Sequence, residues 1–454
     1  MLNIVILAAG EGKRMRSSLP KVLHTLAGKP LLEWVVQAAQ GLANSQLYIV
    51  TGFASEQIHR QLSHLPVTWI EQVQRLGTGH ALTQALPYFQ EANDKVLILF
   101  GDIPLISQAS LQLLLEKSAT HDLSLATSLM TDPRGLGRVL RNAQGQVIGI
   151  VEEKDATPEQ REINEVYAGI MLTTVAKLQT WLPQLSRDNA QKEYYLTDIV
   201  NIAGDEQCDI VGLPIPAGEV QGINDRVQLA ALERQLQQQQ VRQLMLSGVT
   251  VLDPARLDIR GDMDIANDVT LDINVILEGK VKIGAHSYIG PNVILRNVVL
   301  GEHSKVYANS VLEDAVIGNY CAIGPFARIR PGTHTQDHVK IGNFVEVKKT
   351  SIGHYSKVNH LSYIGDATIG HQVNVGAGTI TCNFDGVDKH QTTIGDNAFI
   401  GSNSQLIAPV TIGEGATIGA GSTITRDAPS NALTLSRSKQ ETIKAWRKPA
   451  KRES

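Results

Sequence analysis

The stretch IGDNAFIGSNSQLIAPVTIGEGATIG, residues 394–419, carries the pair Ile-Gly at residues 394, 400, 412 and 418. The same pair recurs upstream at residues 283, 289, 317, 323, 364 and 369, often at intervals of six residues or a multiple of six. A six-residue repeat of this kind is typical of a parallel β-helix, in which each unit is one short strand and a turn. We expect the aliphatic residue to point into a narrow axial core and the small residue beside it to let the chain bend at the corner. Each coil of such a domain contacts only its neighbours, so residues 248–434 are predicted to form a column.

One interruption of the repeat stands out. After Val375-Gly376 the chain reads AGTITCNFDGVDKHQTT, residues 377–393, and the pattern resumes at Ile394. An insertion in a stack of coils becomes a loop on one face, and loops on rigid scaffolds carry function. We therefore expect a functional loop on the column at this insertion.

Residues 1–226 follow a different pattern, in which short apolar runs alternate with helical ones. Strands are predicted at residues 3–10, 47–52, 67–72, 96–102 and 123–130, and helices at residues 31–42 and 109–119. This alternation is typical of an α/β domain. Residues 227–247 contain no Gly or Pro and are predicted to form a linker helix, although their glutamine run is also compatible with disordered low-complexity sequence. Residues 435–454 are predicted to form a basic C-terminal tail.

The composition excludes several classes of protein. The chain has 454 residues, 41 basic and 45 acidic side chains, and a formal net charge of −4. This length predicts two or three domains, and the charge balance argues against nucleic-acid binding. No apolar run is long enough to span a bilayer or resembles a signal peptide. The odd number and wide spacing of Cys208, Cys321 and Cys382 predict reduced thiols in a cytosolic protein, not disulfides or a zinc cluster.

A glycine-rich, basic turn follows the first predicted strand. In VILAAGEGKRM, residues 5–15, the backbone N–H groups of the turn favour an anion, and Arg14 and the nearby Lys21 add positive charge. This chemistry suits a polyphosphate, although the spacing of a Walker loop is absent and a plain tight turn is the alternative. A second glycine-rich turn, GTGHA at residues 77–81, suits close contact with a base or ribose. Asp102 follows another predicted strand, where a carboxylate beside a polyphosphate usually holds Mg²⁺.

The longer stretch LAAGEGKRMRSSLPKVLH, residues 7–24, resembles the signature LxxGxGxRMxxxxPK of sugar-nucleotide pyrophosphorylases. The motifs EQVQRLGTGHA, FGDIPL, GLGRV, IVEEKDAT and QGINDR follow in the order of that family, and the hexapeptide column follows them. Nearly the whole chain therefore resembles the bacterial bifunctional family of N-acetylglucosamine-1-phosphate uridyltransferases and glucosamine-1-phosphate N-acetyltransferases. The resemblance implies a Rossmann-like nucleotide-diphospho-sugar transferase domain over residues 1–226 and a left-handed parallel β-helix over residues 248–434.

The resemblance also implies two reactions of UDP-N-acetylglucosamine biosynthesis. Acetyl-CoA first acetylates glucosamine 1-phosphate. The phosphate of the resulting N-acetylglucosamine 1-phosphate then attacks the α-phosphorus of UTP, and pyrophosphate leaves. The family resemblance further implies Mg²⁺ as cofactor, acetyl-CoA and UTP as co-substrates, and a cytoplasmic homotrimer with no nucleic-acid or membrane partner.

For the uridylyl site, the resemblance makes Asp102 and Asn224 ligands of Mg²⁺, and it makes Arg14 and Lys21 stabilise the phosphates of UTP and the departing pyrophosphate. The family usually has Asn-Thr-Gly where this chain reads Tyr167-Ala168-Gly169, so a bulkier side chain with one hydroxyl replaces the expected sugar-binding asparagine. The resemblance assigns the nucleotide to Leu7, Ala8, Ala9 and Gly10, its uracil and ribose to Gln72, Gly77 and Thr78, and the sugar to Gly137, Glu152, Tyr167 and Asn224.

For the acetyl site, the resemblance makes His360 the general base that accepts a proton as the amine attacks the thioester, a role that suits imidazole near neutral pH. Phe384 replaces the tyrosine usual in CNYDG but keeps the ring, and we expect activity to survive. The resemblance assigns the sugar phosphate to Arg330 and Lys348, the sugar and amine to Tyr363, Asn374 and Asn383, and acetyl-CoA to Ala377, Asn383, Phe384, Ser402, Ala420 and Arg437.

Two other interpretations of the column stay open at this point. It could be a structural scaffold in a nucleotidyltransferase with a single activity on another sugar 1-phosphate. It could also be a zinc carbonic anhydrase, because His334, His338, His354 and His360 lie in the column. The spacing of these histidines does not place three on one face at adjacent coils, and the phosphate motif would be unexplained.

Overall fold

The computed structural model describes residues 1–447, and the end of the predicted tail, residues 448–454, lies outside them. The chain divides into two compact units, with the boundary between Leu236 and Gln237. This boundary falls within α8 (Arg226–Leu246), so the glutamine run is helical. Within residues 1–447, no helix is both long enough and apolar enough to cross a membrane.

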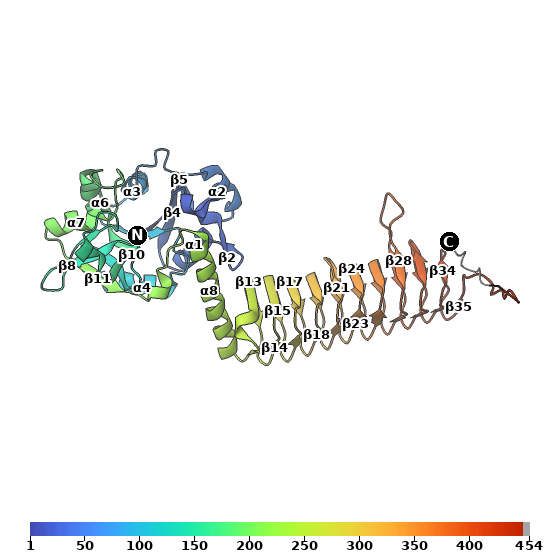
Figure 1. The fold of residues 1–454 in the computed structure, drawn as a ribbon. Coiled ribbons are helices and arrows are strands. Elements are labelled where there is room, and N and C mark those ends of the chain that lie inside the picture. The colour runs from blue at the N-terminus through green and yellow to red at the C-terminus, as the bar shows by residue number, and fades with distance from the viewer. Residues whose placement is uncertain (448–454) are drawn as a thin grey trace, which may run out of the picture. The chain divides into compact units, whose positions relative to one another are not determined.

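The N-terminal unit is built on a mixed sheet whose strands lie in the order β11-β7-β10-β6-β1-β4-β5 (Figure 1). β10 is antiparallel to both of its neighbours, and the other neighbours on this path are parallel. The strands predicted from the sequence correspond to β1, β4, β5, β6 and β7. The bounds are β1 (Leu2–Ala8), β4 (Ser45–Thr51), β5 (Thr68–Glu71), β6 (Lys95–Phe100), β7 (Leu123–Leu129), β10 (Glu165–Thr174) and β11 (Ile210–Pro214), with the hairpin β8 (Arg138–Arg141) and β9 (Val147–Val151) beside β10 and the ribbon β2 (Thr25–Leu26) and β3 (Lys29–Pro30).

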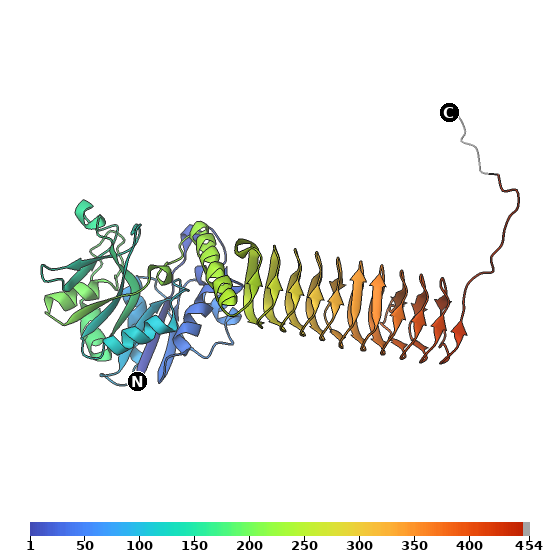
Figure 2. The ribbon, with the colours of Figure 1, turned by 90° about the horizontal axis from the view of Figure 1, so that it is seen from below.

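Helices cover both faces of this sheet (Figure 2), because successive residues of a strand point to opposite sides. On β1, Val5 and Leu7 belong to one hydrophobic core, whereas Ile4 and Ile6 belong to the other. The core of Val5 contains residues of α3 (Thr78–Thr83), α6 (Val175–Trp181) and α7 (Asp198–Asp205), and the core of Ile4 contains residues of α1 (Leu31–Gln40), α2 (Ser55–Gln61) and α4 (Gln108–Lys117). A further short helix is α5 (Pro158–Arg161). The predicted helices at residues 31–42 and 109–119 are α1 and α4, and the layered arrangement brings the carboxyl ends of β1, β4, β5 and β6 to one edge.

The first half of α8 belongs to the core of the N-terminal unit. Leu232 and Leu236 are 1% and 7% exposed and pack with Met15, Leu26 and Leu31. The helix is also fixed by a polar contact, because the backbone N–H of Ala27 donates to Glu233 at 2.8 Å.

The C-terminal unit is a column of stacked coils (Figure 1). Its ladders are parallel, and each strand pairs with a strand one coil further along the chain. Lys305 pairs with Ala322 and Ala322 with Lys340, so one coil takes 17 or 18 residues, or about three six-residue units. The step from Asn374 to Phe399 is 25 residues, because the predicted insertion lies between them.

The strands of the column form two long ladders. One ladder contains β12 (Thr250–Val251), β14 (Thr270–Leu271), β16 (Tyr288–Ile289), β18 (Lys305–Val306), β20 (Ala322–Ile323), β23 (Lys340–Asn343), β25 (Lys357–His360), β27 (Asn374–Val375), β30 (Phe399–Ile400), β33 (Thr417–Ile418) and β35 (Leu433–Thr434). The other contains β13 (Leu257–Ile265), β15 (Val275–Ile283), β17 (Ile294–Leu300), β19 (Val311–Ile317), β21 (Arg328–Ile329), β22 (Thr333–Thr335), β24 (Glu346–Ile352), β26 (Tyr363–Ile369), β28 (Ile380–Cys382), β29 (Thr392–Ile394), β31 (Gln405–Ile407), β32 (Val410–Ile412) and β34 (Thr423–Ile424).

The isoleucines of the repeated Ile-Gly pairs fill the axial core, as the repeat predicts: each of them is buried. The predicted role of the glycines as corner residues is wrong for most pairs, because among them only Gly324 has a positive φ. The neighbouring coil gives the physical reason for glycine. A Cβ on Gly395, for example, would lie 2.7 Å from the backbone nitrogen of Glu414. The glycine therefore allows coils to stack closely.

The corners are instead made by residues of many types in the left-handed conformation. One row of corners carries stacked rings, with centroids 4.5–4.9 Å apart and φ values of 54° to 63°. These rings belong to His286, His303, Tyr320, His338 and Tyr355. His338 thus stacks between two tyrosines, and residues 1–447 contain no group of three or more His, Cys, Asp or Glu side chains placed to hold a metal ion.

The insertion forms a short hairpin that projects from the column after β28 (Figure 1). Phe384 and Lys389 form an antiparallel bridge, and the N–H of His390 donates to the carbonyl of Asn383 at 2.8 Å. Within the hairpin, hydrogen bonds from the His390 ring and from backbone N–H groups hold the pKa of Asp385 below its ordinary value.

Candidate functional site

The glycine-rich turn after β1 forms one wall of a cavity of about 660 Å³. Gly12 has a φ of 66°, and a Cβ on it would lie 2.6 Å from the Cβ of Lys21. Glycine is therefore required for the turn to pack against Lys21. The residues assigned to the nucleotide and its phosphates all line this cavity: Leu7, Ala8, Ala9, Gly10, Arg14, Lys21, Gln72, Gly77, Thr78 and Asp102.

The second glycine-rich turn is held in place by buried polar contacts. The Gln72 side chain donates to the carbonyl of Gly77 at 3.0 Å and lies 3.0 Å from Nδ1 of His80. A Cβ on Gly77 would lie 2.5 Å from the carbonyl oxygen of Tyr194, so only glycine fits there. The hydroxyl of Thr78 accepts from the N–H of Leu196 at 3.0 Å. These contacts hold the turn at residues 77–78 in place in the absence of a ligand.

A second cavity, of about 260 Å³, adjoins the first. It is lined by Gly137, Glu152, Tyr167 and Asn224, the residues that the resemblance assigns to the sugar. The two cavities share lining residues at the carboxyl end of β6 and nearby, namely Thr78, Phe100, Asp102 and Glu193. Asp102 therefore faces both the nucleotide cavity and the sugar cavity.

Two poorly solvated carboxyl groups lie at or beside the sugar cavity: Glu152 lines it, and Asp198 follows the lining residue Thr197. Burial raises the pKa of Glu152, which accepts a hydrogen bond from the Thr197 hydroxyl at 2.9 Å. Burial, with the negative charges of Glu152 and Asp155, raises the pKa of Asp198 to about 6. Of these acids Glu152 lines the cavity, where its carboxyl group can accept hydrogen bonds from sugar hydroxyl groups.

Tyr167, where the family usually has asparagine, lines this cavity and is 7% exposed. Burial and the nearby Glu152 raise the pKa of its phenol, so the hydroxyl stays protonated. Among the described residues this buried hydroxyl has no hydrogen-bond partner, and neither does that of Tyr195, another lining residue.

Asp102 and Asn224 lie close enough together to share one cation. The ammonium group of Lys21 contacts Oδ2 of Asp102 and lies 3.3 Å from Oδ1 of Asn224. A carboxylate and an amide oxygen are hard donors that suit Mg²⁺, which typically completes its coordination with substrate phosphates and water. The residues present therefore fit a magnesium ion.

In the column, His360 begins a row of residues at one corner in successive coils. Its backbone carbonyl accepts from the N–H of Gly378, and the carbonyls of Ala377, Ser402 and Ala420 accept from Asn403, Gly421 and the Arg437 side chain at 2.7, 2.8 and 3.0 Å. The structure thus lines up His360, Ala377, Ser402, Ala420 and Arg437, which the resemblance assigns to acetyl transfer. Asn374 lies on β27, whose neighbours are β25 with His360 and β30.

The ring of His360 is oriented by the preceding coil. Its Nδ1 lies 3.0 Å from Oδ1 of Asn343, its register partner on β23. An amide oxygen only accepts hydrogen bonds, so Nδ1 carries the proton and Nε2 is left with a free lone pair. This tautomer is the one that a general base needs.

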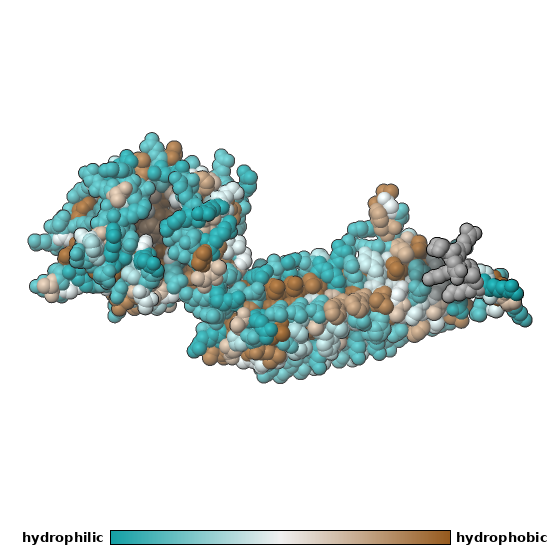
Figure 3. Space-filling view, viewed as in Figure 1, coloured by the Kyte–Doolittle hydropathy of each residue, from teal (hydrophilic) through white to brown (hydrophobic). Residues whose placement is uncertain are grey.

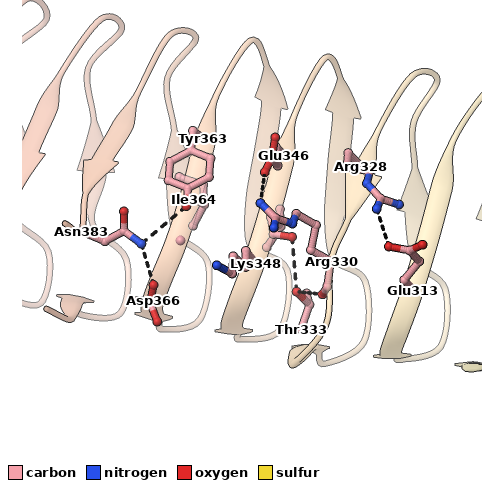
Figure 4. A network of polar contacts seen from close by, with 12 residues as sticks. Glu313, Arg328, Arg330, Thr333, Glu346, Lys348, Tyr363, Ile364, Asp366 and Asn383 are labelled. Carbon is pink, nitrogen blue, oxygen red and sulfur yellow. Dashed lines mark hydrogen bonds and ion pairs between the residues drawn. The ribbon is translucent and has the colours of Figure 1, made fainter. Parts of the chain in front are cut away.

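Basic side chains lie among carboxylates on the strands that carry Arg330, Glu346 and Lys348 (Figure 4). Arg330 donates to Glu346 at 2.7 Å, and Lys348 lies on the neighbouring strand β24. Contact with Lys389 of the hairpin and the charge of Arg330 lower the pKa of Lys348, because neighbouring cations disfavour a further positive charge. Such a cluster attracts a dianionic phosphate.

Asn383, at the base of the hairpin, contacts the same face (Figure 4). Its amide donates to Asp366 at 2.5 Å and lies 3.5 Å from the Tyr363 hydroxyl. A Cβ on Gly365 would lie 2.5 Å from that hydroxyl, so glycine makes room for Tyr363. Phe384 follows Asn383 into the hairpin and is exposed.

Several residues of these surfaces were not found from the sequence. Asn343 lies one coil of 17 residues before His360, a spacing that could have identified it. Lys389 lies within the insertion and is a basic residue of the predicted functional loop. Glu11, Lys13, Arg75 and Glu193 also line the nucleotide cavity.

Comparison with known proteins agrees with both halves of this description. The model of the MobA-like NTP transferase domain matches residues 4–158, and that of the bacterial transferase hexapeptide (six repeats) matches residues 297–331 and 391–426. The chain is 52% identical to the bifunctional protein GlmU of Legionella pneumophila (strain Lens) over 458 residues, which cover 100% of this chain and 99% of that protein. It is 51% identical to the bifunctional protein GlmU of Alkalilimnicola ehrlichii over 453 residues, 99% of this chain and 97% of that protein.

The chain belongs to the bifunctional GlmU family. The GlmU protein of Marinobacter nauticus is a further relative, 49% identical over 451 residues and 99% of each chain. Among solved structures, the inositol-1-phosphate CTP transferase from T. maritima aligns with a TM-score of 0.41 and 15% identity over 51% of this chain and 96% of that chain, too low a likeness to support an argument. As a GlmU enzyme the chain is a nucleotidyltransferase and acyltransferase of UDP-N-acetylglucosamine biosynthesis, and its column is a left-handed β-helix. The GlmU family thus accounts for both a phosphate-binding domain and a decorated column in one chain.

Proposed function

We propose that the two cavities of the N-terminal unit bind UTP and N-acetylglucosamine 1-phosphate side by side, and that the His360 row binds acetyl-CoA and glucosamine 1-phosphate. The observation that carries the first assignment is the position of Asp102 on the wall of both cavities. A group at that place can act on the nucleotide and the sugar phosphate together.

In the uridylyl site, an oxygen of the sugar phosphate attacks the α-phosphorus of UTP. The bond from that phosphorus to the α,β-bridging oxygen breaks, and pyrophosphate leaves with that oxygen. Arg14, Lys21 and the N–H groups of the turn at residues 9–12 neutralise the charge that moves onto the leaving group. Asp102 and Asn224 would hold Mg²⁺, which supplies further charge neutralisation when it is bound.

In the acetyl site, the amine of glucosamine 1-phosphate attacks the thioester carbonyl carbon, and the bond from that carbon to the sulfur of coenzyme A breaks. Nε2 of His360 takes a proton from the attacking nitrogen, because Nδ1 is held by Asn343. Arg330, Lys348 and Lys389 hold the sugar phosphate, while Tyr363 and Asn383 orient the sugar. Arg437 meets the phosphates of the coenzyme.

The experiment that tests this division assays the two reactions separately with purified protein: thiol release from glucosamine 1-phosphate and acetyl-CoA, and pyrophosphate release from added N-acetylglucosamine 1-phosphate and UTP. His360→Ala should slow release of the coenzyme thiol at least about 100-fold, because a general base contributes a factor of about that size. The same variant should leave pyrophosphate release intact. Asp102→Ala should do the reverse. If both rates fall together in a folded protein, the two-site assignment is wrong. If His360→Ala leaves thiol release unchanged, the column is a scaffold.

We also propose that the enzyme is a homotrimer and works in the cytoplasm, where its co-substrates UTP and acetyl-CoA are available. Apolar residues gather along one face of the column (Figure 3). Phe326, Phe344 and Leu361 are 49%, 56% and 63% exposed and occupy successive positions at the corner next to His360. Exposed apolar rows of this kind mark protein interfaces.

Sedimentation equilibrium tests the oligomeric state. We expect a particle of three 49.3 kDa chains, and Phe344→Lys should lower its mass because a charge in the apolar row opposes its burial. Lys305→Met, on the first ladder of the column, is a matched surface control that should leave the mass unchanged. A wild-type monomer or dimer would contradict the trimer.

A further inference from the structure

Lys21 contacts the same two oxygen atoms that the proposed function assigns to the metal. Its ammonium group contacts Oδ2 of Asp102 and lies 3.3 Å from Oδ1 of Asn224. The side chains of Lys21 and Asp102 are only 13% and 21% exposed, so water screens this ion pair weakly. The ammonium group of Lys21 therefore already neutralises the charge of the Asp102 carboxylate.

The backbone of Lys21 is anchored by its neighbours, so a movement away from Asp102 would have to come from its side chain. Lys21 opens a short 3₁₀ helix, Lys21–Leu23, directly after Pro20, and the next residues, Val22 and Leu23, are buried. The absence of a side chain on Gly12 lets the Lys21 stem lie against the glycine-rich turn. The Lys21 ammonium group that contacts Asp102 therefore also lies beside the turn that a phosphate would approach.

We propose that Lys21 is a built-in competitor of the divalent cation, which holds the Asp102–Asn224 pair until a nucleotide triphosphate draws its ammonium group away. This inference rests on the proposed function, which places the metal on Asp102 and Asn224 and the phosphates along the turn. A magnesium ion bonded to both oxygens at about 2.0–2.1 Å would occupy nearly the place of the ammonium. Two cations cannot share that place, because their repulsion at such a separation exceeds what either gains from one carboxylate.

The consequence is a coupling between metal and nucleotide. Without nucleotide, the metal must displace Lys21 from the carboxylate that it already contacts, so the metal binds weakly. With nucleotide bound, the phosphates accept the ammonium, and the metal gains Asp102, Asn224 and phosphate oxygens together. By reciprocity, the metal strengthens nucleotide binding by the same factor.

The test measures metal binding and needs no turnover. Free Mn²⁺ is titrated by electron paramagnetic resonance against the full-length protein, with and without the α,β-methylene analogue of UTP. We expect wild-type protein to bind Mn²⁺ at least about tenfold more tightly with the analogue than without it. Lys21→Met keeps the apolar stem and removes the charge, so it should bind Mn²⁺ alone at least about tenfold more tightly than wild type does, and the analogue should add less.

Controls separate this inference from the proposed metal site. Lys29→Met removes a positive charge outside the cavity lining and should leave Mn²⁺ binding unchanged. Lys21→Gln repeats the test with a second neutral side chain in case the Met variant folds poorly. If Mn²⁺ alone binds wild type as tightly as it binds both Lys21 variants, Lys21 is not a competitor. That result would hold even where Asp102→Asn weakens Mn²⁺ binding and so supports Asp102 as a metal ligand. If Asp102→Asn leaves Mn²⁺ binding in the presence of the analogue unchanged, the metal assignment itself fails.

Discussion

The hydroxyl group of Tyr167 offers a test of the packing around the sugar cavity. It is buried without a hydrogen-bond partner among the described residues. Tyr167→Phe removes this cost, so the free energy of unfolding should stay constant or rise by about 1 kcal/mol. Tyr167→Asn, which restores the family residue but leaves a void, should lower it by about 3 kcal/mol. Urea denaturation followed by tryptophan fluorescence measures both, and a clear loss of stability in Tyr167→Phe would show that the hydroxyl has a partner.

The raised pKa of Asp198 predicts a pH dependence of stability. A carboxyl with a folded-state pKa of about 6, above its ordinary value, binds more protons in the folded than in the unfolded state between these values. The free energy of unfolding therefore falls as pH rises from about 4 to 6. Asp198→Asn should remove that fall and stabilise the protein at pH 7 by about 1–2 kcal/mol, after allowance for solvent screening. Denaturation midpoints at pH 4.5 and 7 test this, and an equal pH dependence in the variant and wild type would contradict it.

Among the structural elements, the hairpin after β28 is a functional addition and not part of the column. β28 and β29 each keep their own partners in the adjacent coils, and the contact from His390 to Asn383 closes the hairpin at its base. Replacing residues 384–389 by Gly-Gly should therefore leave the melting temperature within a few degrees of wild type. It should raise the KM for glucosamine 1-phosphate about tenfold or more, because Lys389 is lost from the phosphate cluster.

A matched variant separates the lysine from the hairpin as a whole. Lys389→Met should reproduce most of the rise in KM with the hairpin intact, and pyrophosphate release from UTP should be unchanged in both variants. Loss of melting cooperativity on removal of the hairpin would show that it supports the column.

The elements also show what could be predicted from the sequence. The Ile-Gly repeat predicted the column because a narrow core admits one aliphatic residue per unit, and that periodicity is visible in the chain. The corners were not predictable from glycine, because residues as different as His286, Tyr320 and Phe344 adopt the left-handed conformation there. The rings of these residues stack because each coil adds 17 or 18 residues and brings the next corner over the last. Since the number of residues in a coil varies, the sequence alone does not show which rings stack.

The residues of the candidate sites also fall into those that the sequence identified and those that it did not. Residues that lie together in a motif, such as those at positions 7–10 and 77–78, were found because a turn after a strand keeps neighbours in sequence close in space. Glu193 and Asn343 were missed because they reach their cavity or row from other segments, whereas Arg75 lies within the quoted motif at residues 71–81 and was not singled out there. Tyr167 was identified as a departure from the family, but its buried and unpartnered hydroxyl follows only from packing.

At the scale of the whole molecule, α8 carries the boundary between the two compact units, and this position predicts how the chain can be divided. A fragment of residues 1–236 keeps Leu232 and Leu236, which cover Met15, Leu26 and Leu31, and keeps Glu233 on the N–H of Ala27. A fragment of residues 1–225 loses all three. Burial of two leucines contributes about 3–5 kcal/mol, so the longer fragment should have a free energy of unfolding higher by about this amount.

Urea denaturation of the two fragments measures this difference, and binding of a hydrophobic dye reports the exposed core in the shorter one. Trp34 is partly buried against the same core, so its fluorescence reports the loss of α8 directly. Leu232→Ala with Leu236→Ala in the longer fragment is the matched control, and it should lower stability toward that of residues 1–225 while the helix is still present. Equal stability of the two fragments would mean that α8 contributes nothing to the N-terminal unit. The domain would then end near Arg226, as the sequence predicts for residues 1–226, and the leucine contacts would be dispensable.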